Sequence, residues 1–537
     1  MRKIESLFIG VGLVALVAAT SGVLWHKIHM QNTENVTFPA TKYGAFLAAQ
    51  HAVYINDFER AARFSADIPD DEYFVVQNTK ILSDFLSGKM PANADLLRDE
   101  KSTAAGLVYD AYLATNENWA DLYKRHKKDE SALASPLRVW SSVATGRGDD
   151  ALKFVEKLKT NASWRAFVRG QIYAERGEID AAAKEFAKVS SDFININDYL
   201  YLMSFYRHNK MDVDAAQLRA EFTMRPGGMY MLDFDAIPDW SNYSGTRNQL
   251  AFSLVQNVSH TQIMMFSDLS ILMLRFAQIV GPAYNENNDA INYYLGQYFY
   301  NNTGDFAKFF GAIPEDSPFY PFGVLRIAEK GGDMAKLERA TRENPLFVPA
   351  ANVLVAHYIS RGDKGAAMRV VDRALKDPNL TEQGRAFFLK SRAHIHFVFG
   401  DIAHAQEDIH AATEVLDIDG EILSLQAKIW AVQKRELDNA YDYAMTMIKR
   451  NPTDVFAWDT LGYVVWAREG TDAAIEVLER VGEVANTCSS LFEHLGDLYV
   501  ASGQTKKAAD AYLRAIDLAN DGLSVIPVLE KKLRKIQ

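Results

Sequence analysis

Small and apolar residues recur near the C-terminus of the chain at a constant spacing of 34 residues. Residues 421–454, 455–488 and 489–522 align at this spacing without a gap, and the apolar positions in each follow the period of two short helices. The aligned columns are Leu461-Gly462 with Leu495-Gly496, Val465 with Tyr499, Ala440 with Ala474 and Ala508, and Ala444 with Leu478 and Tyr512. A repeat of this length predicts a stack of helical hairpins, each burying its apolar face against the next.

Less regular copies of the pattern occur upstream, at residues 348–381 and 386–419 and again at 163–196 and 197–230. Gly-Asp and Gly-Glu pairs such as Gly362-Asp363 separate their two helices, because glycine tolerates a left-handed C-cap and an acid favours the next helix N-terminus. No strand period competes in these regions. The chain is therefore expected to be all-α, built as an α-solenoid of helical hairpins.

The pattern breaks at residues 231–285. An apolar stretch at 263–280 contains Asp268 and Arg275, and two charges make a second membrane span costly, so a buried helix is favoured over that alternative. The expected domains are an N-terminal solenoid at 43–230, an irregular junction with a buried helix at 231–285, a C-terminal solenoid at 286–522 and a capping helix at 523–537. Basic residues on the last helix leave a contact with anionic lipids open.

The first 25 residues predict a membrane anchor. Residues 7–25 carry no charge and as a helix would span roughly 28 Å, close to the hydrocarbon thickness of a bilayer. Arg2 and Lys3 precede this run, so the positive-inside rule places the N-terminus in the cytoplasm and the rest of the chain across the membrane. A cleaved signal peptide is the alternative, with Ala19 and Ser21 as candidate processing residues. Residues 26–42 are expected to form a tether.

The net charge and the cysteine count exclude several classes of partner and site. The net charge of −11 argues against nucleic-acid binding, which requires a basic surface. The single cysteine, Cys488, excludes an internal disulfide and a multi-cysteine metal site, and no His/Asn context marks it as a catalytic thiol.

The repeats resemble the tetratricopeptide repeat family. The resemblance is carried by Trp458, Leu461-Gly462, Val465, Ala474, Leu478 and Val481, and by Leu495-Gly496, Tyr499, Gly503, Ala508, Tyr512 and Ala515. It implies a right-handed solenoid that binds protein or peptide partners. More loosely, residues 290–522 are similar to exported repeat proteins of proteobacterial cell envelopes, through the segments 313–320, 459–463 and 494–498. That similarity implies a scaffolding role in the envelope.

In repeats of this kind the first helix of each hairpin lines a concave groove, and aromatic side chains there offer a large contact area to an apolar helix or an extended peptide. The expected partner-binding residues are Trp164, Phe167, Tyr201, Phe205, Phe387, Phe397, Ile422, Leu425, Ile429, Phe456, Tyr463 and Trp466. A competing interpretation is that several of them only pack against the next hairpin.

Some members of the family capture a partner's C-terminal carboxylate with basic groove residues. Here the groove-side candidates form no basic cluster, so a receptor for such a tail is not expected. These candidates are Lys390, His394, Asp459, Glu493 and Asp497.

The best candidates for metal ligands are four histidines with two acids nearby, namely His394, His396, His404, His410, Glu407 and Asp408. Histidines two apart on one helix point about 200° away from each other, and six apart is also off one face. Only a cross-helix pair, such as His394 with a histidine of the second helix, could meet, whereas zinc requires three or four ligands. We therefore expect no metal site and no cofactor.

The sequence contains no phosphate-binding loop, metalloprotease motif or serine-hydrolase motif, so no enzyme activity is expected. We predict a membrane-anchored scaffold or adaptor in the inner membrane of a Gram-negative bacterium, with a cytoplasmic N-terminus and a periplasmic solenoid. Its partners would be envelope proteins or their peptide segments, without nucleic acid or a small-molecule substrate. The alternative is a regulatory subunit of an envelope enzyme, such as a cell-wall hydrolase or a protease.

Overall fold

A computed structural model describes residues 42–68, 74–99, 102–131, 134–223, 237–260, 268–285, 287–302, 305–416, 419–482 and 487–537. All regular elements in these ranges are helices and no strand occurs among them, which confirms the all-α prediction. The predicted anchor at 7–25 lies outside the described residues. Among the helices that are described, none is both long and apolar enough to cross a membrane.

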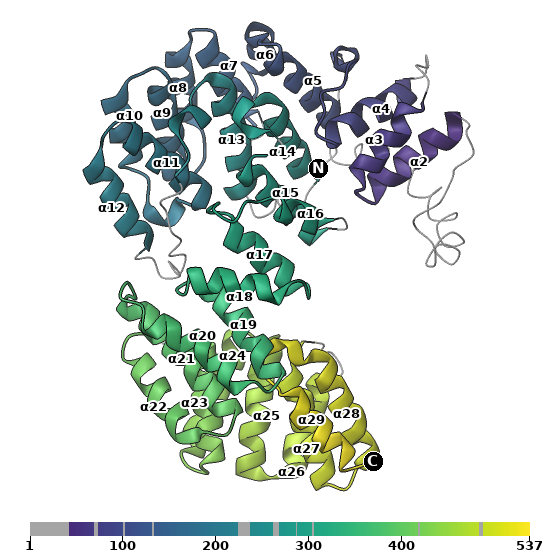
Figure 1. The fold of residues 1–537 in the computed structure, drawn as a ribbon, viewed down its shortest axis with the longest axis vertical. Helices are drawn as coiled ribbons and strands as arrows, with labels where there is room; N and C mark the ends of the chain where they lie inside the picture. The colour runs from purple at the N-terminus through teal and green to yellow at the C-terminus, as the bar shows by residue number, and fades with distance from the viewer. Residues whose placement is uncertain are drawn as a thin grey trace. The chain divides into compact units, whose positions relative to one another are not determined.

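The chain forms two compact units. The first comprises Met1–Leu218 and Ala236–Tyr320, and the second comprises Arg219–Asp235 and Pro321–Gln537. The helices of the first unit are α2 (Lys42–Tyr54), α3 (Phe58–Ala66), α4 (Phe74–Leu86), η1 (Ala94–Leu97), α5 (Thr103–Thr115), α6 (Trp119–His126), α7 (Ser135–Ala144), α8 (Gly148–Lys157), α9 (Ala162–Glu175), α10 (Ile179–Phe186), η2 (Ser191–Phe193), α11 (Ile196–His208), α12 (Asp212–Thr223), η3 (Trp240–Asn242), α13 (Thr246–His260), α14 (Asp268–Val280), η5 (Pro282–Tyr284), α15 (Asp289–Asn301) and α16 (Phe306–Gly311) (Figure 1).

Within the first unit, α13 and α14 turn back onto earlier hairpins, with α13 against α7 and α14 against α5. The indole Nε1 of the fully buried Trp140 in α7 donates a hydrogen bond to Ser253 Oγ of α13 over 2.8 Å. The predicted buried helix in this region corresponds to α14, whose Leu274 and Phe276 are fully buried. The boundaries between the two units fall after Leu218, Asp235 and Tyr320.

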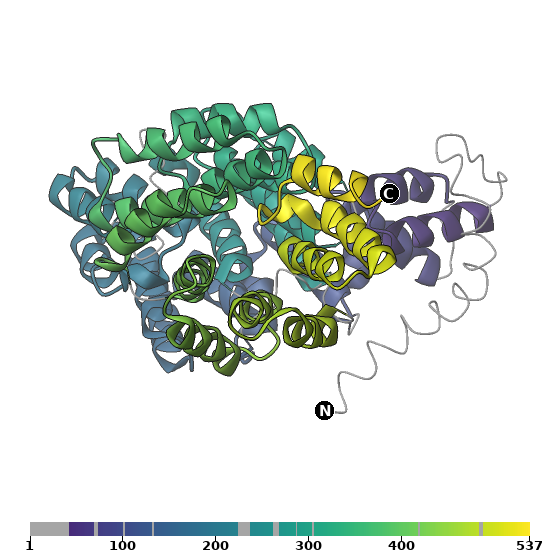
Figure 2. The ribbon, with the colours of Figure 1, turned by 90° about the horizontal axis from the view of Figure 1, so that it is seen from below.

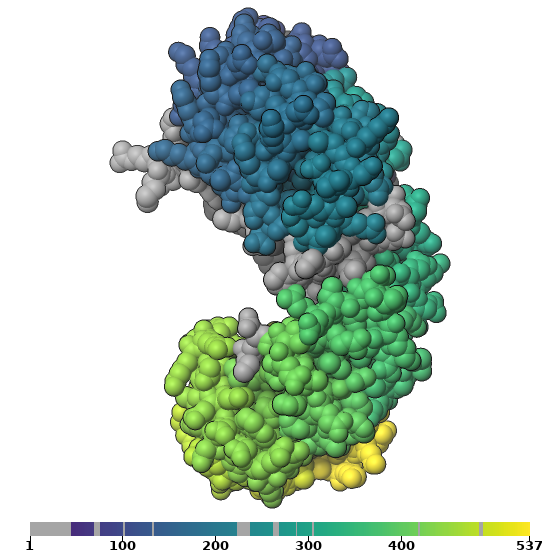
Figure 3. Space-filling view, turned by 90° about the vertical axis from the view of Figure 1, so that its left-hand side faces the viewer, coloured from purple at the N-terminus to yellow at the C-terminus, as the bar shows by residue number. Residues whose placement is uncertain are grey.

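The second unit is a series of antiparallel hairpins, which form a continuous surface in the space-filling view (Figure 3). Its helices are α17 (Tyr320–Glu329), α18 (Met334–Glu343), α19 (Val348–Ser360), α20 (Lys364–Leu375), α21 (Glu382–Val398), α22 (Ile402–Thr413), α23 (Gly420–Val432), α24 (Leu437–Arg450), α25 (Val455–Glu469), α26 (Thr471–Gly482), α27 (Ser489–Ala501), α28 (Thr505–Leu518), η6 (Ala519–Asp521) and α29 (Ile526–Arg534). Five hairpins follow one another from α19 to α28.

Glycine is required where the two helices of a hairpin cross. A β-carbon at Gly462 would lie 2.2 Å from Leu478 Cδ2, and one at Gly496 would lie 2.3 Å from Tyr512 Cε1. A β-carbon at these distances would force Leu478 or Tyr512 to shift, so the glycine column of the repeat leaves room for a large side chain of the second helix.

Gly-Asp pairs form turns between helices, with the glycine ending one helix and the aspartate capping the next. Gly362 has a φ of +77°, and Asp363 caps α20 by accepting a hydrogen bond from Ala366 N at 2.8 Å. The same capping occurs at Asp305, ahead of α16, where Oδ1 accepts from Lys308 N at 3.1 Å. At these two turns the local sequence supplies the cap of the next helix.

The arc of hairpins in the second unit closes on its first member. The helix η6 packs against α19, and a β-carbon at Gly522 would lie 2.6 Å from Ala356 Cα. Figure 2 shows the yellow C-terminal end of the unit lying close to the green helices with which the arc begins. Next along the chain, α29 packs on α28, and Lys532 Nζ is 2.7 Å from both Glu493 Oε1 and Asp497 Oδ2.

Candidate functional site

A pocket of about 410 Å³ opens on the inner side of this arc. Its walls come from the first helices of five successive hairpins, α19, α21, α23, α25 and α27, with the segment around η6 as the closing wall. The residues that line it are Asn352, Val355, Ala356, Ile359, Phe387, Lys390, Ser391, His394, Phe397, Val398, Glu421, Ser424, Leu425, Lys428, Phe456, Ser490, His494, Asp521, Gly522 and Leu523. Every hairpin of the arc thus contributes to a single concave site.

The closing wall is held by polar contacts. His394 Nε2 is 3.1 Å from the carbonyl oxygen of Gly522, so this nitrogen carries the proton and donates. Asp521 accepts hydrogen bonds from the Ser489 backbone N–H at 2.7 Å and from Ser489 Oγ at 2.6 Å. Burial lowers the pKa of His394, because the charged ring would lose its hydration.

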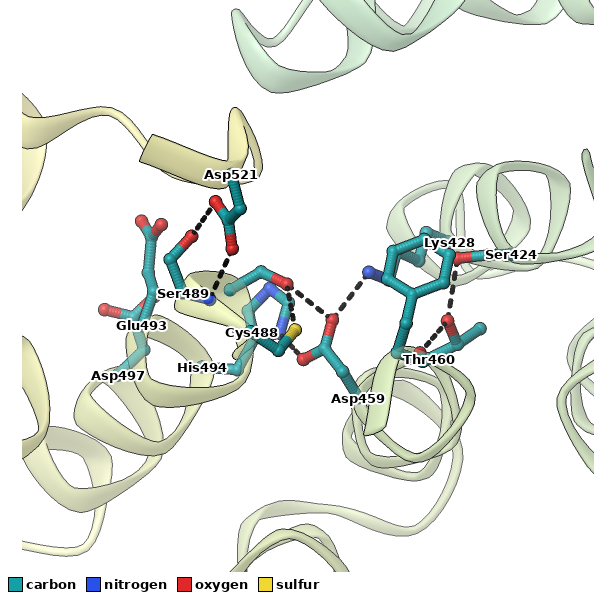
Figure 4. A network of polar contacts seen from close by, with 12 residues as sticks. Ser424, Lys428, Asp459, Thr460, Cys488, Ser489, Glu493, His494, Asp497 and Asp521 are labelled. Carbon is teal, nitrogen blue, oxygen red and sulfur yellow. Dashed lines mark hydrogen bonds and ion pairs between the residues drawn. The ribbon is translucent and has the colours of Figure 1, made fainter. Parts of the chain in front are cut away.

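A buried ionic network forms one side of the pocket (Figure 4). Asp459 is completely buried and accepts hydrogen bonds from Lys428 Nζ, Ser490 Oγ and His494 Nδ1, each at 2.7 Å. Burial alone would raise the pKa of Asp459, but Lys428 and His494 outweigh it and hold the pKa well below the usual carboxylate range. The carboxylate is therefore charged at neutral pH and fixes the position of three side chains around it.

Two lysines bring positive charge to the pocket beside aromatic rings. Lys428 Nζ lies 4.9 Å from the ring centroid of Phe456, and Lys390 Nζ lies 4.6 Å from that of Phe387. Lys390 also pairs with Glu421 at 2.6 Å and with Asp419 at 2.9 Å. Burial opposes the charge of Lys390, yet Glu421 and Asp419 raise its pKa. The pocket thus combines apolar rings with paired charges, and each ammonium stays over a ring face.

Four of the predicted partner-binding residues line this pocket: Phe387, Phe397, Leu425 and Phe456. Ile422 and Ile429 are buried in the core between hairpins and are not available to a partner.

The last two predicted residues of this unit lie away from the pocket lining. Tyr463 packs against His494, with ring centroids 4.5 Å apart, and Trp466 packs on the core that runs from α23 to α29. Helix periodicity places a residue on a face, but here that face is shared between the pocket and the neighbouring hairpin.

The predicted groove of the first unit is filled by the chain itself. Phe167, Tyr201 and Phe205 are fully buried. Phe252 of α13 stacks on Phe167 at a centroid distance of 5.9 Å and lies 4.5 Å from Tyr201, while Trp240 of η3 lies 5.5 Å from Phe205. The expectation of an open aromatic groove is corrected here, because α13 and η3 cover these rings. Trp164 remains partly exposed.

Sequence reasoning did not select Lys428 or Asp521. Lys428 is the only charged residue between Ile422 and Val432 in an otherwise largely apolar helix, and that isolation was a signal. Asp521 gave none, because its role depends on the closure of the arc. Lys390 and His394 were correctly expected on the groove side, and each contacts an acid or a carbonyl group as described above.

The structure also places Cys488 and the four candidate histidines. Cys488 is buried, and burial followed by the nearby Asp459 raises the pKa of its thiol to about 12, which is the opposite of an activated nucleophile. Of the four histidines, His394 faces the pocket, whereas His396 and His404 meet each other at the turn between α21 and α22. His396 and His404 thus form a cross-helix pair, whereas His394 was the example considered in the sequence.

Comparison with known proteins agrees with the repeat assignment. Residues 490–521 match the family model described as Tetratricopeptide repeat, and this segment is the α27–α28 hairpin with η6. The match confirms the resemblance for the last repeat of the arc.

Two solved structures have low similarity to the chain. One is the crystal structure of the APC/C hetero-tetramer Cut9-Hcn1, with 14% identity, 92% coverage of this chain, 96% of that chain and a TM-score of 0.30. The other is Tom70 from yeast, with 12% identity, coverage of 82% and 96%, and a TM-score of 0.25. At these TM-scores neither likeness bears on the fold or the function. No curated protein matches the sequence.

Proposed function

We propose that the protein is a membrane-anchored scaffold that binds segments of partner proteins in the pocket of its second unit. The observation that carries the proposal is the convergence of five hairpins on one site that combines Phe387, Phe397 and Phe456 with Lys390 and Lys428. A volume of about 410 Å³ falls within the range of ligand pockets and accommodates a few side chains, not a whole helix. We therefore infer a short apolar or aromatic peptide segment as the occupant.

Preorganisation supports this proposal. The carboxylate of Asp459 fixes Lys428, Ser490 and His494, so little side-chain entropy remains to be lost when a partner binds. The aromatic rings offer large apolar contacts at low entropic cost. The proposal is for binding without catalysis.

The proposed setting is the bacterial cell envelope. We infer from the sequence that residues 7–25 anchor the chain in the inner membrane, with the N-terminus in the cytoplasm and both units in the periplasm. A fusion of alkaline phosphatase to the C-terminus tests this orientation, because the enzyme is active only after export. Activity of the fusion, with the chain retained in carbonate-washed membranes, is expected. An inactive fusion would refute the periplasmic placement, and release by carbonate would refute the anchor.

The pocket is tested by crosslinking in cells, with a photoreactive amino acid placed at Ser391 on the pocket wall. Partners captured there should be lost in the Phe387→Ala/Phe456→Ala variant. The matched control is Trp458→Ala, since Trp458 lies on the same helix as Phe456 but outside the pocket lining. Equal capture by all three proteins would show that the pocket does not bind partners. Should the partner be a cell-wall hydrolase or a protease, a change in its activity on addition of the purified full chain would identify the protein as a regulatory subunit.

A further inference from the structure

The turn between α21 and α22 brings two imidazole rings onto one carboxylate. His396 Nδ1 is 3.1 Å from Asp401 Oδ2, and His404 Nδ1 is 2.9 Å from Oδ1 and 3.0 Å from Oδ2. One candidate ligand atom from each residue lies within 4.8 Å of the other two. Two short helices and their turn thus place three potential donor atoms on one side of the hairpin, away from the residues that line the pocket.

This donor set suits a divalent transition-metal ion. Two imidazole nitrogens and one carboxylate are a common set for such ions, with solvent completing the coordination. Donor atoms around a tetrahedral ion with bonds of about 2.0–2.1 Å lie about 3.3 Å apart. The observed separations of 2.9 to 3.1 Å between Asp401 and the two rings need only a small expansion to reach that value.

A second carboxylate, that of Asp408, lies near the far side of the His396 ring. The second nitrogen of that ring, Nε2, faces Asp408 Oδ2 at 4.0 Å. Asp408 is itself fixed by Arg392, whose Nε and Nη2 donate to its two oxygens at 2.8 and 2.7 Å. At 4.0 Å the pair is too long for a hydrogen bond, so Asp408 contributes only negative charge near the ring. The two rings also stack, with centroids 5.2 Å apart.

One neighbour opposes a cation. Lys364 at the start of α20 places its Nζ 3.6 Å from Asp401 Oδ2. Its side chain is 37% exposed, so the ammonium has room to move into solvent when another cation approaches. Removing this charge should therefore favour metal binding.

We propose that His396, Asp401 and His404 bind one divalent transition-metal ion, such as Zn²⁺, through Nδ1 of each histidine and the carboxylate, with water in the remaining positions. The ion would join α21 to α22 and stabilise their hairpin. The site differs from the four-histidine set suggested by the sequence, because Asp401 in the turn replaces His394 and His410.

The experiment uses the full-length purified protein, stripped with EDTA and titrated with Co²⁺ and with Zn²⁺. Co²⁺ gives visible absorption bands that report its coordination, and calorimetry with Zn²⁺ gives the stoichiometry and the dissociation constant. His404→Gln should weaken binding by more than the 10- to 100-fold typical of losing an outer-shell partner. The matched control is His410→Gln, an exposed histidine on the same helix, which should leave the dissociation constant unchanged.

Lys364→Gln supplies the second arm, because it should tighten binding while the set of ligands stays the same. His404 is 62% exposed on its side chain, so His404→Gln is expected to fold, and circular dichroism checks this. Absence of Co²⁺ absorption, a stoichiometry that is unchanged in His404→Gln, or an equal loss in His410→Gln would each overturn the proposed site.

Discussion

Nε2 of His394 donates a hydrogen bond to the carbonyl oxygen of Gly522, a residue that lies 128 positions further along the chain. The contact joins the second hairpin of the arc to the segment that follows the fifth. This contact explains why the pocket of the second unit has a closing wall. Its contribution can be measured as a change in the free energy of unfolding.

Cys488 should serve as a reporter of opening in the second unit, because it is the only cysteine in the sequence and is 2% exposed. Burial and Asp459 raise the pKa of its thiol from 9.0 to about 12, so the thiolate fraction at pH 8 is about a thousandfold lower than for a free thiol. We expect very slow reaction with Ellman's reagent in buffer and rapid reaction in urea. Fast labelling of the folded protein would contradict the buried position.

Gly522→Ala should destabilise the second unit. The residue has a φ of +75°, and a β-carbon would lie 2.6 Å from Ala356 Cα, so the substitution adds both backbone strain and overlap. The expected loss is about 1–3 kcal/mol in the free energy of unfolding, read from the urea dependence of Cys488 labelling. Gly420→Ala is the control, because a β-carbon there meets only Met447 Cε at 3.9 Å and should cost nothing.

The closure should weaken in mild acid. Burial is the largest influence on His394 and lowers its pKa below the ordinary 6.5, with Lys428 acting in the same direction. Below pH 6.5 the unfolded chain therefore takes up a proton that the folded chain does not, and the free energy of unfolding falls as the pH decreases. His394→Gln keeps a donor but does not titrate, so its stability should vary less between pH 7 and 5.5. Parallel curves for the two proteins would contradict this role.

Lys428→Met should be strongly destabilising. It leaves the fully buried carboxylate of Asp459 without its ammonium partner, at an expected cost of about 3–5 kcal/mol. The double variant Lys428→Met/Asp459→Asn removes both charges and should recover part of the loss. Urea unfolding of the unsubstituted protein, the two single variants Lys428→Met and Asp459→Asn and the double variant completes a double-mutant cycle, and a coupling free energy near zero would show that the pair does not act as a unit.

Much of the second unit could be predicted from the sequence, because each repeat carries the same glycine, apolar and capping positions. Gly462 and Gly496 mark the helix crossings, and Gly362-Asp363 marks a turn, in each case through contacts within one hairpin. Four of the predicted groove residues, among them Phe387 and Phe456, line the pocket, and partner binding by them stays a prediction.

The remainder depends on contacts between distant segments, for which a periodic pattern gives no signal. Whether η6 reaches α19 depends on the small rotations between five successive hairpins, and these accumulate along the arc. Likewise, nothing in the apolar period of α13 indicates that Phe252 covers Phe167 and Tyr201. The meeting of His396 and His404 required the turn geometry around Asp401 as well.

The contact of η6 with α19 has a mechanical consequence. An open helical solenoid is elastic, and its superhelical pitch changes when its ends move apart. In the second unit, the hydrogen bond between His394 and Gly522 and the packing of Gly522 on Ala356 join the end of the arc to its first helices. The pitch can therefore change only after these contacts break. A partner too large for the resting pocket must contribute binding free energy to breaking them. Affinity for such a partner and stability of the closed arc are then thermodynamically opposed. A substitution that destabilises the closed arc should therefore raise the affinity for the partner.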